Sequence, residues 1–409
     1  LPAGASPVAL ELADTLLGTD GPPDLVSVRA RKLGPQVTEL HGLLGEHLTS
    51  APFGAEVAAL LARHYGADAT LPSAFAGVLA ELFAGQGLVI LDPSDPALVP
   101  YAAPIHRQAF ERADALAACL SERSIDLQRA GISVQVHVRP DSPLSFWHQG
   151  DRHGPRFRLE PADAHHWRLC GSQSTVPRPD IADDLLRRPE RFSTSALLRP
   201  LLQDSWLPTV AYVGGPGECA YFAQLAPLYD AFDRQMPLVV PRARFALVDA
   251  AARRLAGQLG LRPEDAQRPE RALLAHLGSQ VGLAGEPAPA PGDLSRSMNE
   301  PLRQQLGRLA ADAESWDPGL AKAARRLDRT LARQVERFVD RYLRALGGRD
   351  TTTRQRLARF QGLLAPGGVP QERCYGFATF AAKAGTSQLI TQLLDRAEPW
   401  QHELVWLDL

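Results

Sequence analysis

The chain has 409 residues, of which 45% are hydrophobic and 22% are charged, an ordinary composition for a globular protein with room for two or three domains. Its formal net charge of −2 provides no global positive field, so composition does not support non-specific binding to nucleic acid or to anionic membranes. Lysine occurs only as Lys32, Lys322 and Lys383. Positive charge therefore rests on arginine, which suits carboxylate or phosphate binding better than proton transfer.

Cysteine usage and hydropathy indicate the compartment. The four cysteines are scattered with no CxxC spacing, which argues against a disulfide framework or a zinc knuckle and predicts reduced thiols. No stretch approaches the length of a membrane-spanning apolar segment, and the N-terminus lacks the basic-then-apolar pattern of a signal peptide. We therefore expect a cytoplasmic protein.

After an irregular start of about forty residues, the first part of the chain predicts helices and one strand. Apolar spacing predicts helices over residues 54–65 and 72–84. The run GLVILDP, residues 87–93, predicts a strand buried on both faces, followed by a helical stretch over 96–123. A strand followed by a helix is typical of an α/β fold.

The middle of the chain predicts two kinds of sheet. SVQVHV, residues 133–138, alternates apolar and polar residues, and FRLE near Phe157 and HWRL near Trp167 do so more weakly, which predicts an antiparallel excursion outside the main sheet. TVAYVGG (209–215) and PLVVP (237–241) predict buried strands separated by a helix over 218–230. Strand, helix and strand at this spacing predict a right-handed parallel crossover.

The last third is predicted to be mainly helical. An extended or irregular linker is expected at GEPAPAPGD, residues 285–293. Apolar residues recur every three or four positions from Leu302 to Tyr342, which predicts a coiled-coil-like helical hairpin with a bend at 317–319. The chain then ends in the alternating ELVWLDL, which suggests a return to the core.

These patterns predict an α/β fold with a partial parallel sheet, an antiparallel excursion and an α-helical, coiled-coil-like domain. The expected domains are a core over residues 1–250, the coiled coil over 251–365 and a C-terminal segment over 366–409 that returns to the core.

The sharpest local motif is AYVGGPGE. A predicted strand ends at Gly214 and Gly215, Pro216 suits the first position of a helix, and Glu218 can cap the free backbone donors. In open α/β sheets, anionic ligands bind beyond the carboxyl ends of the strands, near helix N-termini. A tight turn that binds nothing explains the motif equally well, because the spacing is neither a dinucleotide fingerprint nor a P-loop.

Polar residues next to this motif favour a ligand site. Arg199, Gln203 and Asp204 lie between strongly apolar stretches, where unpartnered burial would be costly. They need a ligand or each other, so an internal Arg199–Asp204 bridge remains an alternative to a substrate clamp. Arg242 and Arg244 follow the next predicted strand, at the edge where arginine can bind phosphate or carboxylate.

Metal and covalent chemistry have less support. His148, Asp151 and His153 lie in a stretch that reads as a solvent-exposed hairpin tip, so no metal site is predicted. The chain contains no Gly-x-Ser-x-Gly elbow, and its cysteines have no convincing histidine partner, which argues against a covalent hydrolase.

Taken together, these motifs resemble one family. FSTSALLRPLLQDSWLPTVAYVGGPGECAYFAQL followed by PLVVPRARFAL is similar to the cysteine-adding enzymes of bacillithiol biosynthesis, the BshC-type cysteine ligases. The resemblance extends to LPSAFAGVLAELFAGQGLVILDPSDP upstream, to PRFRL, and to APGGVPQERCYGFATFAAKAG near the C-terminus. It covers the chain from about Phe53 to the end.

The resemblance implies a Rossmann-like core with inserted connecting segments, a coiled-coil domain that pairs two subunits, and binding of ATP or another nucleotide. The implied reaction joins the carboxyl group of cysteine to the amine of glucosaminyl-malate. Because a carboxylate is a poor electrophile, amide formation requires its activation as an acyl-adenylate or acyl-phosphate.

The expected catalytic residues are Arg199, which can neutralise developing charge, and Asp204 and Glu218, which can orient or deprotonate the amine. The residues expected to bind substrate or nucleotide are Gln203, Tyr212, Gly214, Gly215, Pro216, Tyr221, Gln224, Arg242 and Arg244.

Two departures from the family pattern leave alternatives open. Ser195 stands where the family usually has Asn, and the family's opening segment, with a Gly-Gln-Gln loop and an acidic-His-Asp motif, has no counterpart here. The chain, which begins with Leu1, is expected to be a fragment or to come from a lineage that lost that segment. The alternatives to a cysteine ligase are a non-catalytic dimeric scaffold of the same fold and an amide ligase for a different amino sugar.

Overall fold

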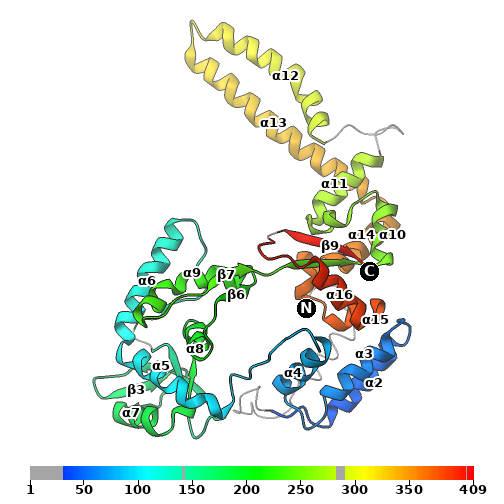
Figure 1. Cartoon of the computed structure of the whole chain (residues 1–409). Helices are drawn as coiled ribbons and strands as arrows, with labels where there is room; N and C mark the ends of the chain where they lie inside the picture. The colour runs from blue at the N-terminus through cyan, green and yellow to red at the C-terminus, as the bar shows by residue number, and fades with distance from the viewer. Residues whose placement is uncertain (1–30, 141–142, 282–290, 402) are drawn as a thin grey trace. The chain divides into compact units, whose positions relative to one another are not determined.

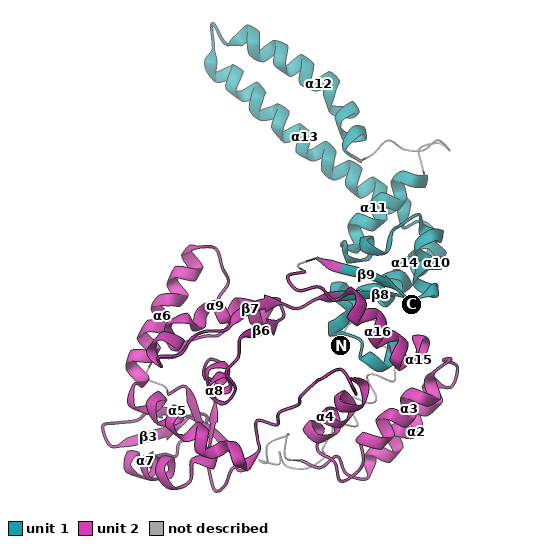
Figure 2. Ribbon diagram, in the orientation of Figure 1, with its two compact units in different colours: residues 1–11, 245–380, 405–409 teal, residues 12–244, 381–404 magenta. Residues whose placement is uncertain are grey.

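A computed structural model describes residues 31–140, 143–281, 291–401 and 403–409. These residues divide into two compact units, shown in different colours in Figure 2. The described part of Leu12–Arg244 forms unit 2 together with Ala381–Leu404, and unit 1 contains the described part of Phe245–Phe380 together with Val405–Leu409. Within the described residues, no helix has the length and apolar character needed to cross a membrane.

The two helices predicted in this part of unit 2 are confirmed as α3 (Gly54–His64) and α4 (Leu71–Leu82), whereas α2 (Gln36–Leu48), which begins within the segment expected to be irregular, was not predicted. Helix α4 begins where Thr70 accepts a hydrogen bond from the Ser73 backbone N–H, at 3.3 Å, so its first turn is capped by a side chain.

The strand expected at residues 87–93 is absent. The segment is irregular and exposed, and the Val89 side chain is 89% exposed. A strand buried on both faces needs hydrogen-bonded neighbours, and no described strand pairs with this segment. The helical stretch after it is a short 3-10 turn followed by α5 (Val99–Glu111) and α6 (Ala113–Arg129).

The antiparallel excursion is a five-stranded sheet with the order β4-β3-β2-β1-β5. Its strands are β1 (Ser145–His148), β2 (Arg156–Pro161), β3 (His166–Leu169), β4 (Thr175–Pro177) and β5 (Phe192–Thr194). The predicted strands at FRLE and HWRL are confirmed as β2 and β3, and the buried rings of Trp147 and Trp167 pack in one core with α7 (Arg178–Arg187).

SVQVHV does not form the predicted strand. The buried side chain of Gln224 accepts from the Val136 backbone N–H at 3.1 Å and donates to the Val136 carbonyl at 3.0 Å. A side-chain amide therefore takes the place of a neighbouring strand.

The predicted parallel crossover is confirmed. Strand β6 (Ala211–Gly214) pairs in parallel with β7 (Leu238–Pro241), and α9 (Pro216–Ala231) connects them and lies beside both (Figure 1). The expected full burial is wrong, because Val213 is 62% and Leu238 57% exposed. Helix α9 packs on these strands through contacts such as the Tyr212 and Phe222 rings, whose centroids are 4.3 Å apart.

Unit 1 is built around a helical hairpin. Helices α12 (Pro291–Ala313) and α13 (Pro318–Gly347) run side by side in Figure 1, which confirms the predicted hairpin and its bend. Asp317 caps α13 by accepting from the Leu320 backbone N–H at 3.0 Å. Residues 285–290 of the expected linker lie outside the described residues, and 291–293 begin α12.

Helix α11 (Glu270–Val281) packs on the base of α13. It contacts α13 so closely that a Cβ atom at Gly278 would lie 2.0 Å from the Leu343 carbonyl oxygen. Only glycine permits this approach of two backbones. The predicted final strand is confirmed as β9 (Leu404–Asp408), which pairs with β8 (Arg244–Val248).

Candidate functional site

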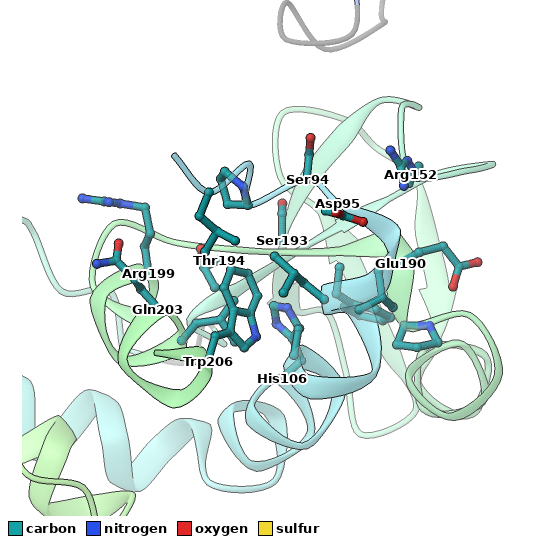
Figure 3. Close-up of a pocket in the computed structure, with 18 of the residues that line it drawn as sticks. Ser94, Asp95, His106, Arg152, Glu190, Ser193, Thr194, Arg199, Gln203 and Trp206 are labelled. Carbon is teal, nitrogen blue, oxygen red and sulfur yellow. The ribbon is translucent and has the colours of Figure 1, made fainter. Parts of the chain in front are cut away.

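A cavity of about 470 Å³ lies in unit 2 between α5, β5 and α8 (Leu198–Trp206), as Figure 3 shows. This volume lies within the range of small-molecule sites. The side chains that can hydrogen-bond or carry charge at its wall are those of Ser94, Asp95, His106, Arg152, Arg156, Glu190, Ser193, Thr194, Arg199, Gln203 and Trp206. Leu98, Leu202 and Phe192 supply apolar surface.

His106 is a buried polar group of the cavity wall. It comes from the buried face of α5 and is 1% exposed. Its Nδ1 is 2.7 Å from Ser145 Oγ, so one of the two groups donates a hydrogen bond to the other. Burial lowers the pKa of His106 to about 4, and the ring is therefore neutral at physiological pH.

Ser193 presents a hydroxyl group from β5. Its Oγ is 2.9 Å from Nε2 of His148, a buried residue at the end of β1. Nδ1 of the same ring is 3.0 Å from the Gly154 carbonyl oxygen, so both ring nitrogens have partners. The sequence prediction placed His148 on a solvent-exposed tip, and its exposure of only 2% corrects that expectation.

A buried ion pair holds the strand that carries Ser193. Arg191 pairs with Asp184 of α7 and donates through Nε to the His148 carbonyl oxygen at 2.9 Å. Trp147 Nε1 donates to the same Asp184 carboxylate at 2.8 Å. Because these groups are buried and bonded to one another, they fix β1 and β5 rather than contact a ligand.

Charged side chains of both signs lie around the cavity. Arg199 and Gln203 of α8 lie on one side of the view in Figure 3, and Arg152 and Glu190 lie on the other. Asp95 also lines the wall, and its Oδ1 accepts from the Ala97 backbone N–H at 2.9 Å. Guanidinium groups suit a carboxylate or phosphate, and carboxylates suit an ammonium group, so the cavity matches a ligand that carries both.

Two hydrogen bonds involve the tyrosines between Arg199 and the glycine turn. Arg199 Nη2 donates to the Tyr221 hydroxyl at 3.0 Å. The Tyr212 hydroxyl donates to Glu218 Oε1 at 3.1 Å. Burial, followed by these neighbours, raises the pKa of Tyr212, so its hydroxyl stays protonated as the donor.

In the turn between β6 and α9, side chains of the protein itself bond or contact the backbone that a ligand would reach. The Gly215 backbone N–H donates to Glu218 Oε2 at 2.7 Å, which confirms the predicted cap. A Cβ atom at Gly215 would lie 3.0 Å from Arg242 Nε, so the Arg242 side chain lies against the turn. The Glu218 carboxylate already bonds the amide that a phosphate would use, so the turn does not fit a nucleotide phosphate as it stands.

Two other predicted residues hold helices together. The Tyr229 hydroxyl of α9 donates to Asp204 of α8, so Asp204 bonds this tyrosine instead of the Arg199 of the alternative internal bridge. Gln224 is fully buried, and besides Val136 its amide also donates to Ser124 Oγ at 3.1 Å. The structure therefore gives Gln224 a packing role in place of the expected ligand contact.

Of the predicted residues, Arg199 and Gln203 line the described cavity, whereas Glu218, Tyr212, Gly214, Gly215, Pro216, Tyr221 and Arg242 belong to the turn and its network. Arg244 begins β8, after the end of β7.

Sequence reasoning missed several cavity residues. Asp95 lies in DPSDP directly before a helix, a position typical of an N-cap, and His106 is the polar member of an apolar helical face that includes Ala102 and Ala109. Both signals were present in the sequence. Arg152 and Arg156 had no local signal, because only the pairing of β1 with β2 brings their hairpin to the cavity.

Comparison with known proteins identifies the family. Residues 26–243 match the family model for the N-terminal Rossmann-like domain of BshC of bacillithiol biosynthesis. Residues 291–409 match the model for its C-terminal coiled-coil domain. All cavity residues lie within the first match.

Three similar bacterial proteins support the same family assignment. The relative from Solibacter usitatus is 34% identical over 93% of this chain and 68% of its own length. Relatives from Koribacter versatilis and Symbiobacterium thermophilum are 31% and 32% identical over 83% and 88% of this chain. The chain spans 61% and 64% of those two, and all three are named "Putative cysteine ligase BshC". The chain therefore belongs to the BshC family of bacillithiol biosynthesis, with a Rossmann-like domain and a coiled-coil domain.

Proposed function

We propose that this chain contributes the acceptor site of a cysteine ligase, which joins the carboxyl group of cysteine to the amine of glucosaminyl-malate. The main support for this proposal is the cavity of about 470 Å³ within the part of the chain that matches the Rossmann-like domain. Arg199, Arg152, Asp95 and Glu190 line its wall. An amino sugar linked to a dicarboxylate carries the ammonium and carboxylate groups that these side chains complement.

The chemistry requires an activated carboxyl group. ATP or another nucleotide would supply this activation as an acyl-phosphate or acyl-adenylate. The guanidinium groups of the cavity suit the charge that develops on such a group, whereas the capped Gly215 turn is less suited. Such a reaction belongs in the cytoplasm, where ATP is available.

Direct product formation tests this proposal. The chain is incubated with labelled cysteine, glucosaminyl-malate and ATP, and the amide product is measured by mass spectrometry. We expect an ATP-dependent product with the mass of the two substrates joined with loss of water. No product from the folded chain, with or without the opening segment of a longer relative, would contradict the proposal.

We infer that the helical hairpin pairs two copies of the chain. Apolar side chains stay exposed along α12 and α13, including Leu309, Leu320, Leu327 and Phe338. An exposed apolar stripe at helical spacing suits pairing with another helix.

The mutation Leu331→Asp tests this pairing, because it places a charge on half-buried α13 surface at the same helical spacing. A dimer should become a monomer in analytical ultracentrifugation, while Arg333→Asp on the exposed face leaves it unchanged. A dimer that persists in Leu331→Asp contradicts pairing through the hairpin. A folded, pairing chain that forms no product would favour the scaffold alternative.

A further inference from the structure

The strongest unassigned feature of the cavity is the Ser193–His148 pair. His148 is 2% exposed, and its ring nitrogens are 3.0 Å from the Gly154 carbonyl oxygen and 2.9 Å from Ser193 Oγ. Ser193 itself lines the cavity. A buried histidine thus lies directly behind a hydroxyl that a ligand can reach.

The hydrogen-bond directions follow from the chemistry of these groups. A carbonyl oxygen can only accept, so Nδ1 of His148 carries a hydrogen and donates to Gly154. In the form of the ring with this single N–H, Nε2 is the acceptor and the Ser193 hydroxyl donates to it. The Ser193 oxygen consequently keeps its lone pairs for a donor in the cavity.

This arrangement is that of an activated hydroxyl with an oriented base. The Gly154 carbonyl orients the ring, and Arg191 donates to the His148 carbonyl oxygen at 2.9 Å, which holds the backbone of the same residue. A base within hydrogen-bond reach of a hydroxyl, itself oriented by a third group, is a recurring arrangement for proton transfer.

We propose that Ser193 accepts an N–H group of the acceptor amine and relays its proton to His148; this inference rests on the proposed function. The ammonium group first loses one proton to solvent, and the nitrogen of the resulting uncharged amine attacks the activated carbonyl carbon of cysteine, forming the C–N bond. The bond between that carbon and the activating group breaks, and the group leaves with its electron pair. The amine proton passes to Ser193 Oγ as the Ser193 proton passes to His148 Nε2.

The relay predicts different effects for its two members. Ser193→Ala removes the acceptor, so affinity for glucosaminyl-malate should fall about tenfold and kcat about a hundredfold. His148→Phe keeps a buried ring and the Ser193 hydroxyl, so affinity should stay within about threefold while kcat falls about a hundredfold. Calorimetry measures binding, and product mass measures turnover.

A matched control separates this role from a general loss of packing. Ser205→Ala removes a hydroxyl of α8 that donates to the Leu201 carbonyl and does not line the described cavity. It should leave binding and turnover unchanged. Circular dichroism and thermal unfolding of each variant verify that the chain is folded.

The possible outcomes are distinct. Unchanged binding by folded Ser193→Ala overturns the contact to the amine. If the unaltered chain forms product and His148→Phe has the same kcat, the relay is wrong, while the proposed function still stands. Absence of product from the unaltered chain, both with and without the opening segment of a longer relative, overturns the proposed function and the relay with it. Calorimetry then still decides whether Ser193 contacts the amine.

Discussion

Two neighbouring regions of unit 2 carry similar polar residues but use them differently. In the cavity region, formed by α5, β5 and α8, side chains such as Ser193 and Gln203 face open volume. In the turn region, where β6 meets α9, Glu218 bonds Gly215 and Tyr212. The difference teaches that a polar cluster at a sheet edge marks a ligand site where its groups also line a cavity, as Ser193 does, and not where they only bond one another within a turn, as Glu218 does.

The largest expected effect concerns stability of the cavity region as pH changes. The pKa of His106 is lowered from 6.5 to about 4 in the folded chain, so the unfolded chain binds the proton first as pH falls. Stability is fully present above pH 6.5 and decreases down to about pH 4, by roughly 3 kcal/mol.

Urea unfolding at several pH values measures this dependence. His106→Gln removes the titrating group, so the variant should lose much less stability between pH 6.5 and 4 than the unaltered chain. Equal slopes for both proteins would show that His106 titrates normally in the folded state.

The next effect concerns the affinity for glucosaminyl-malate, which should depend on the cavity region and not on the turn region. Arg199→Ala removes a guanidinium from the cavity wall and should weaken binding of glucosaminyl-malate by about ten- to a hundredfold, the usual range for a charged hydrogen bond. Arg107→Ala, an exposed arginine of α5 that pairs with Glu111, is the matched control. Equal affinities in calorimetry would remove Arg199 from the site.

A smaller effect is expected in the turn region. Glu218→Ala removes the cap of Gly215 and the acceptor of Tyr212, so the free energy of unfolding should decrease by about 1 kcal/mol. Affinity should stay within about threefold, because Glu218 is outside the described cavity wall. A loss of affinity of tenfold or more would favour the sequence prediction that Glu218 orients or deprotonates the amine.

The smallest effect is expected for Gly215→Val. The backbone at Gly215 has φ −71° and ψ 171°, which valine adopts readily, and the new Cβ only displaces the Arg242 side chain. If the turn bound a phosphate, this change would abolish nucleotide binding. We expect unchanged binding of ATP in calorimetry, and loss of binding with unchanged circular dichroism would favour the turn as the site.

The sequence predicted those parts of the fold that local patterns determine. The helical hairpin and the strands near Phe157 and Trp167 follow from periodicity, and the parallel β6–β7 pair follows from two short apolar runs separated by a helix. Residues 87–93 and 133–138 have strand-like composition as well, but strand formation depends on a neighbour. Residues 87–93 have none in the described sheets, and Gln224 bonds the backbone of Val136.

The candidate site was predicted only in part, for a similar reason. Arg199 and Gln203 were identified because they are polar residues between strongly apolar stretches, and they do line the cavity. Whether Asp204 or Gln224 finds a partner within the protein depends on contacts across helices, and no local pattern encodes them. Ser193 and His148 are 45 residues apart and meet only through the pairing of β1 with β5.

A crystal structure of the chain with glucosaminyl-malate tests the central claim most directly. The cavity account predicts ligand density between α5, β5 and α8, with the amine at Ser193 and a carboxylate at Arg199. Density at the Gly214–Gly215 turn, with the cavity empty, would contradict it.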